Sequence, residues 1–194
     1  VVNWTNEEGA RFQPSLTGSS VYVGALPLAD ALALEDRAGI SLGDAIGAIG
    51  FRGDRTFALR PVRYVELHVE QGDRLESAGV EIGVVTGGSA TRKMTVAFLG
   101  EASHTGPTPM PRRRDALRAA ALAITRLYDM VEEADLGLHA AASQMTISPL
   151  SPNVVPSHVR VWFEVRHREL ATAERIADAF LEEVRQRVSS RGVD

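Results

Sequence analysis

Two adjacent carboxylates stand near the start of the sequence, in the stretch VVNWTNEEGARF. Val1–Trp4 is typical of a buried strand, and Glu7 and Glu8 follow shortly after it. Because like charges repel and an acid near a core is costly unless it is paired, the doublet is either solvated or shares a cation. A divalent metal needs anionic oxygen or imidazole ligands, and a carboxylate beside it can act as a base toward water. The doublet alone leaves both interpretations open.

A histidine that could share this cation lies in YVELHVEQG, residues 64–72. Alternating apolar and polar residues predict a strand over Tyr64–Val69, with His68 on its polar side. A histidine in that place is either a metal ligand or a hydrogen-bonded structural residue. Zinc sites generally need at least three protein ligands, so one His and one Glu do not complete a site.

Two later stretches carry residues suited to substrate binding. In GEASHTGPTPM, His104 enters a loop stiffened by two prolines, which can hold an imidazole toward a neighbouring surface. In SPNVVPSHVRVWFEVRH, the amide of Asn153 could donate to a developing oxyanion, and Arg166 could bind a substrate carboxylate through two parallel hydrogen bonds. The alternatives are a surface-loop histidine and an ion pair of Arg166 with Glu164 or a similar acid. Arg112–Arg114 is interpreted as a solvated helix start.

The elements that must position these residues differ between the two halves of the chain. Residues 1–90 are glycine-rich, and their patterns predict helices over Leu28–Asp36 and Gly43–Ile49, and strands over Tyr64–Val69 and Ile82–Thr86. Strands that alternate with helices favour an α/β layer.

The second half, residues 91–194, begins after a junction near Gly87–Arg92 and predicts a β-α-β-β-α order. Strand periodicity marks residues 93–98, 145–147 and 159–165. One helix is expected to follow Asp115, and Thr172 is expected to cap the second. This is a two-layer α+β unit with both helices on one face of the sheet, and its last strand is expected to be missing.

Composition excludes several classes of protein. The 194 residues carry a net charge of -4, which argues against a nucleic-acid binder, and the absence of cysteine removes disulfides and thiolate chemistry. GAIGFRG is not a dinucleotide fingerprint, GGSATRK lacks the end of a P-loop, and no G-x-S-x-G elbow occurs. No apolar run reaches membrane-spanning length, so a cytoplasmic protein is expected. The chain starts without Met and stops after a helix, which we interpret as a fragment.

Several motifs occur together and in a fixed order: NEEGARF, ELHVEQG with LESAG and IGVVTG, GEASHTGPTPM with RRRDAL, and NVVP with EVRH. On these motifs the chain resembles the amidase/hydantoinase/carbamoylase branch of the M20 metallopeptidase-like hydrolases, over nearly its whole length. This branch includes N-carbamoyl-L-amino-acid hydrolases, allantoate amidohydrolases and β-ureidopropionases. The resemblance implies that residues 1–90 are part of an α/β metal-binding catalytic domain, that residues 91–194 are a lid and dimerisation domain, and that the protein is a homodimer.

The resemblance also implies a role for each candidate residue. It makes Glu7 the general base, Glu8 and His68 metal ligands, His104 a stabiliser of the oxyanion, and Asn153, Arg166 and Gln71 substrate-binding residues. The cofactor would be two divalent ions of zinc, manganese, cobalt or nickel, and the substrate a small ureido compound with a carboxylate. The family's His-x-Asp motif and a further histidine ligand are absent from this chain. We therefore expect the chain alone to bind metal weakly and to lack turnover.

Two other functions stay open. Allantoate carries a ureido group and a carboxylate, so Arg166 would serve it equally well. The alternative hypothesis is a non-catalytic protein, in which residues from about 93 onward form a module that only dimerises. An upstream His-x-Asp in the full-length sequence would support the enzyme, and its absence would support the module. A related peptidase is disfavoured because the motifs match the ureido-cleaving branch.

Overall fold

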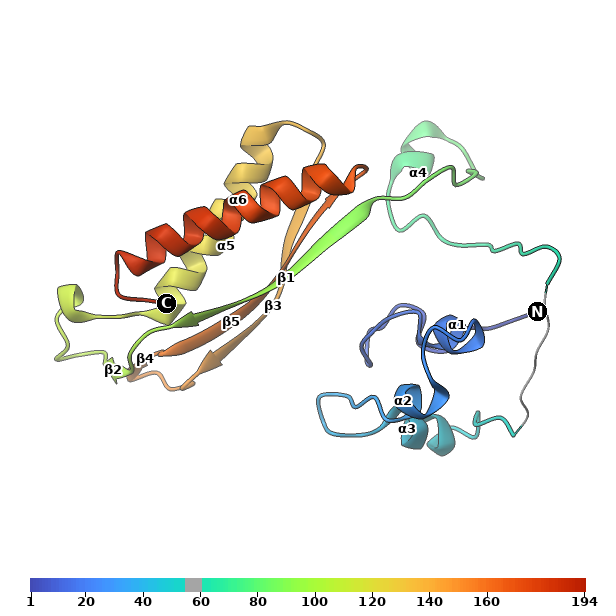
Figure 1. Cartoon of the computed structure of the whole chain (residues 1–194), viewed down its shortest axis with the longest axis horizontal. Helices are drawn as coiled ribbons and strands as arrows, with labels where there is room; N and C mark the ends of the chain where they lie inside the picture. Colours follow the sequence, from blue (N-terminus) through green and yellow to red (C-terminus); the bar gives the residue numbers. More distant parts are fainter. Residues whose placement is uncertain (55–60) are drawn as a thin grey trace. The chain divides into compact units, whose positions relative to one another are not determined.

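The computed structural model describes residues 1–54 and 61–194. Two compact units are formed, unit 1 over Val1–Gln71 and unit 2 over Gly72–Asp194 (Figure 1). The functional division into a catalytic part, 1–90, and a lid, 91–194, stays a prediction. Among the helices in the described ranges, none combines the length and the apolar character needed to cross a bilayer.

Unit 1 consists of short helices and loops. Its helices are α1 (Thr17–Tyr22), α2 (Leu28–Leu32) and α3 (Leu42–Ala48). Ser41 is the N-cap of α3, and its hydroxyl accepts the Asp44 N–H at 3.0 Å. Both predicted helices are therefore confirmed, although α2 ends four residues early. Within the described part of unit 1 the only β-structure is an isolated bridge between Glu35 and Ser41, so the α/β layer stays a prediction.

Three predicted strands are wrong. Residues 1–4, 64–69 and 82–86 form no strand in the structure, and apart from the partly buried Trp4 their large apolar side chains are exposed, with Leu67 at 97% and Val85 at 87%. An extended segment becomes a strand only when a neighbouring segment supplies backbone hydrogen bonds. Among the described residues, none forms a β-ladder with these segments. Side-chain alternation carries no information on whether a partner strand is present.

Unit 2 contains a three-stranded antiparallel sheet in the order β1-β5-β3. Its strands are β1 (Ala90–Leu99), β3 (His139–Ser148) and β5 (His158–His167), and the short β2 (Ser103–His104) and β4 (Val154–Val155) form a separate ladder. The central strand β5 buries every second side chain, with Val159, Val161, Phe163 and Val165 between 0% and 2% exposed. This alternation is what a strand packed on one face requires.

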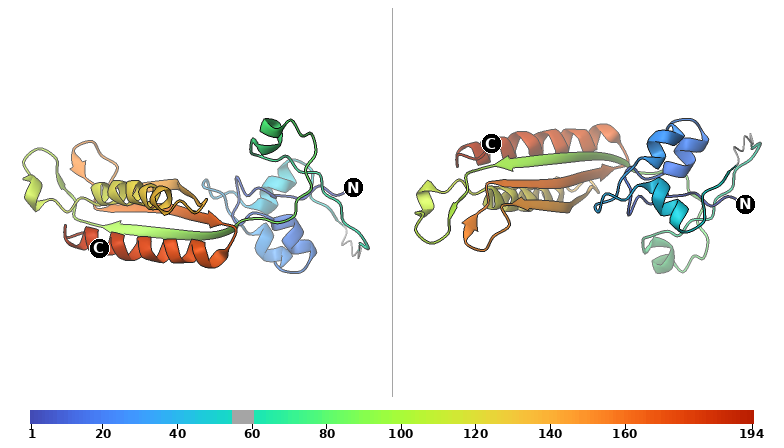
Figure 2. Two further views of the ribbon diagram at one scale, coloured as in Figure 1. Left: turned by 90° about the horizontal axis from the view of Figure 1, so that it is seen from above. Right: turned by 90° about the horizontal axis from the view of Figure 1, so that it is seen from below.

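Helices α5 (Ala116–Ala134) and α6 (Leu170–Ser189) pack against each other and cover that face of the sheet (Figures 1 and 2). The helix predicted after Asp115 is confirmed, and Asp115 caps it by accepting two backbone N–H groups at 3.0 Å. Phe180 of α6 packs edge-on against Phe163 of β5 at 5.2 Å between ring centroids. The short helix α4 (Arg74–Ala78) precedes β1, and the 3-10 turn η1 (Met110–Arg112) precedes α5.

The predicted β-α-β-β-α order of long elements is thus confirmed, whereas the predicted cap of the last helix is wrong. The N-cap residue of α6 is Glu169, and Thr172 lies in the first turn. The reason is a tight turn at the end of β5, where Nδ1 of His167 accepts the Glu169 N–H at 3.0 Å. The chain therefore enters the helix earlier than the residue types indicate.

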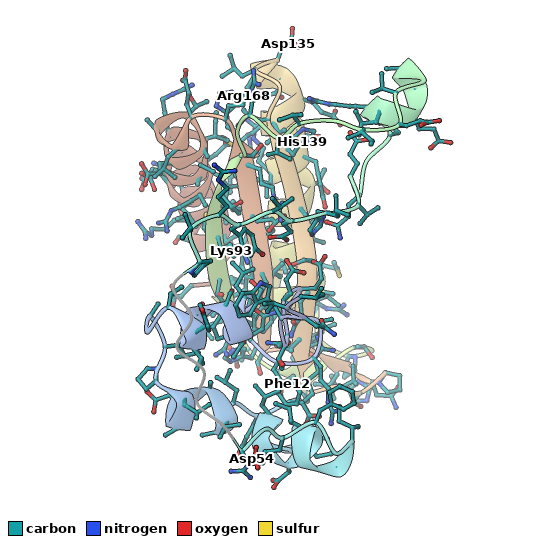
Figure 3. All side chains as sticks on the ribbon, turned by 90° about the vertical axis from the view of Figure 1, so that its right-hand side faces the viewer. Phe12, Asp54, Lys93, Asp135, His139 and Arg168 are labelled. Carbon is teal, nitrogen blue, oxygen red and sulfur yellow. The ribbon has the colours of Figure 1, made fainter. Side chains whose placement is uncertain are left out.

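The register of the sheet fixes which residues of unit 2 share an end. Leu99 pairs with His158 at the end from which β2 and β4 extend, whereas Thr91 and His139 both pair with Arg166 at the other end. In Figure 3, His139 and Arg168 mark this second end, and Lys93 lies on the intervening stretch of β1.

Candidate metal centre and substrate-binding residues

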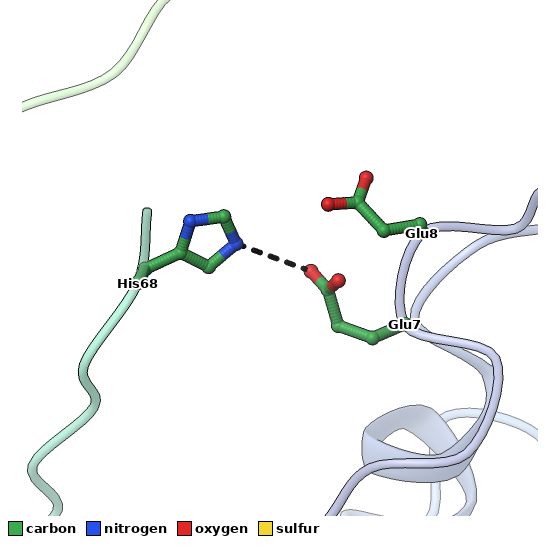
Figure 4. A group of neighbouring side chains, drawn as sticks. All are labelled: Glu7, Glu8 and His68. Atoms are coloured by element: carbon green, nitrogen blue, oxygen red, sulfur yellow. Dashed lines mark ion pairs between the residues drawn. The ribbon is translucent and has the colours of Figure 1, made fainter. Parts of the chain in front are cut away.

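The structure brings the carboxylate doublet and the predicted histidine ligand together in unit 1 (Figure 4). One ligand-type atom from each of Glu7, Glu8 and His68 lies within 4.8 Å of the others. Nε2 of His68 is 3.9 Å from Oε1 of Glu7, with both side chains partly exposed. This is the convergence that the sequence hypothesis required, while the separate roles of the three residues stay predictions.

Asn6 fixes the loop that carries the doublet. Its backbone is left-handed, with φ of 54°, and its Nδ2 lies 2.9 Å from the Phe12 carbonyl, 3.1 Å from the Pro14 carbonyl and 2.8 Å from Oγ1 of Thr17. Thr17, which starts α1, is only 2% exposed. The amide of Asn6 therefore anchors the doublet to the start of a helix.

Gly9, directly after the doublet, closes the same loop. It has φ of 66°, and a Cβ placed there would lie 2.8 Å from the Ser15 backbone. Any other residue would be strained by both the backbone angle and this contact. The glycine after Glu7 and Glu8 is thus required by the loop that presents them.

A backbone contact selects the tautomer of His68. Its Nδ1 lies 2.7 Å from the carbonyl of Val69, and because a carbonyl only accepts, Nδ1 carries the proton. In the neutral ring this leaves the Nε2 lone pair facing the carboxylates, which is the arrangement of a metal-binding imidazole. The same Val69 contact, helped by the charges of Glu7, Glu66 and Glu8, raises the pKa of His68 above its usual value.

Two contacts flank His68 and tie its segment to the start of the chain. On one side, Nε1 of Trp4 donates to the hydroxyl of Tyr64 at 3.1 Å. On the other, Nε2 of Gln71 donates to Oε1 of Glu8 at 2.7 Å. Gln71 therefore orients a predicted metal ligand, a role that the sequence reasoning missed because it treated this residue as part of the substrate pocket. No spacing signal could reveal a contact between residues so far apart in sequence.

The donor set fits a divalent cation. Carboxylate oxygens and an imidazole nitrogen are ligands that Zn²⁺ and related ions accept, at about 2.0–2.2 Å from the ion. Ligand atoms on one ion are therefore about 3–4 Å apart, somewhat closer than the present limit of 4.8 Å. Since all three side chains are at least partly exposed, small rotations can close this difference.

In unit 2, the structure brings His104 and Asn153 next to each other. Their segments pair as β2 and β4, with His104 opposite Val154, and the Thr105 N–H donates to the Asn153 carbonyl at 3.1 Å. The Gly106 N–H donates to Nδ1 of His104 at 3.1 Å, so the neutral ring carries its proton on Nε2. An exposed Nε2–H is the donor that an oxyanion requires.

Arg166 is not brought to this group. It lies on β5 near the end opposite His158, and about 3.4 Å of strand rise per residue puts those two residues roughly 25–30 Å apart. Its Nε and Nη2 also donate to the two carboxylate oxygens of Glu164, at 2.8 and 3.2 Å. The predicted alternative, an ion pair of Arg166 with Glu164, is therefore present. Within a single copy of unit 2, Arg166 and His104 are too far apart to contact the same small molecule.

Solved structures resemble the fold closely. A hydantoinase/carbamoylase family amidase from Burkholderia vietnamiensis matches with a TM-score of 0.86 at 35% sequence identity, over 98% of this chain and 46% of that chain. A second amidase of that family, from Burkholderia ambifaria, matches with a TM-score of 0.71 at 41% identity, over 99% of this chain and 47% of that chain. No family model matches the sequence. The class defined by the fold is that of the hydantoinase/carbamoylase amidases.

The chain is also similar to curated proteins of known name. The N-carbamoyl-L-amino-acid amidohydrolase of Rhizobium meliloti is 39% identical over 176 residues, which are 88% of this chain and 41% of the relative. The allantoate amidohydrolase of Bacillus subtilis is 34% identical over 170 residues, which are 86% of this chain and 41% of the relative. The predicted resemblance is thus confirmed. The chain spans less than half the length of these relatives.

Proposed function

We propose that this chain is part of a metal-dependent amidohydrolase that cleaves the ureido C–N bond of N-carbamoyl-L-amino acids. The products would be the free amino acid, carbon dioxide and ammonia. The observation that carries the proposal is the convergence of Glu7, Glu8 and His68, from segments far apart in sequence, on one small volume. The names of the relatives support the ureido substrate class.

Glu8 and His68 would hold a divalent cation, with Gln71 orienting the carboxylate and Val69 orienting the imidazole. When bound, such a cation lowers the pKa of a water molecule and polarises a carbonyl group. A pair of ions needs further ligands, which the family resemblance places outside this chain. Zinc and manganese both suit the donor set.

Glu7 would move the protons. Its carboxylate lies beside the two ligands without a hydrogen bond to Gln71, so it is free to take a proton from water as the ureido carbon is attacked. Glu7 would then pass this proton to the leaving nitrogen. The Nε2–H of His104 and the amide of Asn153 would donate to the new oxyanion, and Arg166 would bind the substrate carboxylate.

The distance along β5 supports a homodimer. The carboxylate and the ureido carbon of a carbamoyl amino acid are a few bonds apart, whereas Arg166 and the His104 loop lie at opposite ends of unit 2. One substrate can meet both only if two copies contribute, Arg166 from one chain and His104 with Asn153 from the other. Closed dimers of this kind are the commonest homo-oligomers.

The test is ammonia release by the full-length protein. The panel would contain N-carbamoyl amino acids, allantoate and ureidopropionate, each with added manganese or zinc. We expect metal-dependent release from at least one carbamoyl amino acid. Release from none of the panel, with metal shown to be bound, would reject the proposal.

Allantoate is the second candidate substrate, favoured by the allantoate amidohydrolase among the relatives. The same panel separates the two by the ratio of kcat/KM values. If unit 2 instead only dimerises, His104→Ala would leave the rate unchanged.

A further inference from the structure

The arginine triplet before α5 is not uniformly solvated, contrary to the prediction. Arg112 and Arg114 are exposed, whereas Arg113 is partly buried. The Nε of Arg113 donates to the Thr108 carbonyl at 3.0 Å, and its Nη2 donates to the Thr105 carbonyl. We propose that Arg113 is a positioning residue that holds the loop of His104 in its working conformation. The part of this proposal that concerns catalysis rests on the proposed function.

The loop clamped by Arg113 is the one that fixes His104. Thr105 follows His104 directly, and its carbonyl accepts from Arg113 while its N–H donates to the Asn153 carbonyl at 3.1 Å. One residue therefore receives the guanidinium on one side and binds the Asn153 turn on the other. Thr108 lies on the far side of the Gly106 amide that selects the His104 tautomer. The guanidinium thus spans the stretch that sets both the position and the tautomer of the His104 ring.

Hydrogen bonds next to Arg113 fix the backbone that carries this side chain. The carbonyl of Arg114 accepts the Glu101 N–H at 2.9 Å, beyond the end of β1. The Ala116 N–H donates to the Pro156 carbonyl at 3.2 Å, next to β4, and Asp115 caps the helix between them. These contacts attach the start of α5 to Glu101, which lies between β1 and β2, and to Pro156, which follows β4. A planar guanidinium with several fixed donors suits a link between two carbonyls, and a single ammonium would reach one of them less well.

The first experiment measures amide hydrogen exchange in the full-length protein, in peptides that cover residues 103–109. Arg113→Gln removes two charge-assisted hydrogen bonds, so exchange there should rise on the order of tenfold or more. Arg112→Gln is the matched control, since this neighbour is exposed, and it should leave exchange unchanged. Peptides covering Val159–Val165 report whether the core is intact, and Arg113→Lys should give an intermediate rate if glutamine prevents folding. Unchanged exchange at 103–109 in both Arg113 variants would overturn the proposal.

The second experiment is a double-mutant cycle on ureido hydrolysis. Arg113→Gln should lower kcat on the order of 10- to 100-fold with little change in KM, because the oxyanion donor acts in the transition state. In a His104→Ala background the same substitution should have almost no further effect. An equal loss in both backgrounds would show that Arg113 does not act through His104. If the wild-type protein hydrolyses no ureido substrate, the proposed function fails while the exchange experiment still decides whether Arg113 holds the loop.

Discussion

The separation of Arg166 from His104 leads to a prediction about which chain supplies which group. If Arg166 binds the substrate carboxylate as proposed, Arg166→Met alone would remove a two-pronged charge-assisted contact and should lower kcat/KM by about 10- to 100-fold. His104→Ala would remove the proposed oxyanion donor and should lower kcat by about 10²–10³-fold. Arg166 lies roughly 25–30 Å along β5 from His158, the end of the sheet from which the strand of His104 extends. The two defects should therefore complement each other across a dimer.

The size of the recovery follows from counting sites. In a hybrid dimer with Arg166→Met on one chain and His104→Ala on the other, one site receives both defects and the other receives none. The hybrid should therefore have about half of the wild-type activity per dimer. The control carries both substitutions on one chain, paired with a wild-type chain. Each of its sites then lacks one group, and the hybrid should be nearly inactive.

The assay is co-expression of two differently tagged full-length chains, purification of hybrids over both tags, and ammonia release. If both groups instead came from one chain, the result would be inverted, with the control hybrid active and the first hybrid inactive. Such an inversion would refute the inference drawn from the register of β5, and with it the proposal that Arg166 and His104 of one site come from different chains. A protein that is monomeric in solution at assay concentrations would do the same.

Three further predictions concern single residues. Glu7→Gln should keep cation binding by titration calorimetry but lower ammonia release by at least about 10²–10⁴-fold, and near wild-type turnover would contradict its role. Gln71→Met should weaken zinc or manganese binding by about 10- to 100-fold, because its bond to a ligand carboxylate is lost, and an unchanged affinity would argue against that role. The hydrogen bond from Arg126 lowers the pKa of Glu183 below the ordinary 4.5, so this ion pair stabilises unit 2 above that pH and is lost as the pH falls through the lowered value. Glu183→Gln should therefore lower Tm at neutral pH, with the difference from wild type shrinking in acid, and a difference that grew in acid would be evidence against this assignment.

The long elements of unit 2 could be predicted because each carries its own packing pattern. Every second residue of β5, such as Val159, Val161 and Phe163, is apolar, and α5 has one apolar face. The two apolar surfaces pack against each other in one core. The segment around Leu67 shows the same alternation but has no partner strand among the described residues. Periodicity therefore predicted which side chains could share a face, and could not predict whether anything covers that face.

The candidate site was predictable at the level of residue types and not at the level of contacts. Adjacent acids and a histidine on a polar face indicated a cation, and the structure brings them together. Asn6 and Gln71, which hold the doublet, and Arg113, which holds the His104 loop, act through carbonyls or carboxylates that only the folded chain brings near. Arg113 illustrates the difference, since its two neighbours of the same type are exposed and only the structure separates them.

Polar contacts hold residues 64–71, the segment that carries His68, in place. This limits the affinity for a divalent cation that is expected of the chain itself. The side-chain contacts that join this segment to the doublet and to Trp4 are exposed or partly exposed, and water and salt weaken such contacts. A cation on Glu8 and His68 would therefore have to order this segment as it binds, and part of its binding energy would be used in doing so. We expect weak binding of zinc or manganese to the 194-residue chain, accompanied by slower amide exchange over residues 64–71. Tight binding at two sites in calorimetry would contradict this account, because it would require ligands that the described contacts do not supply.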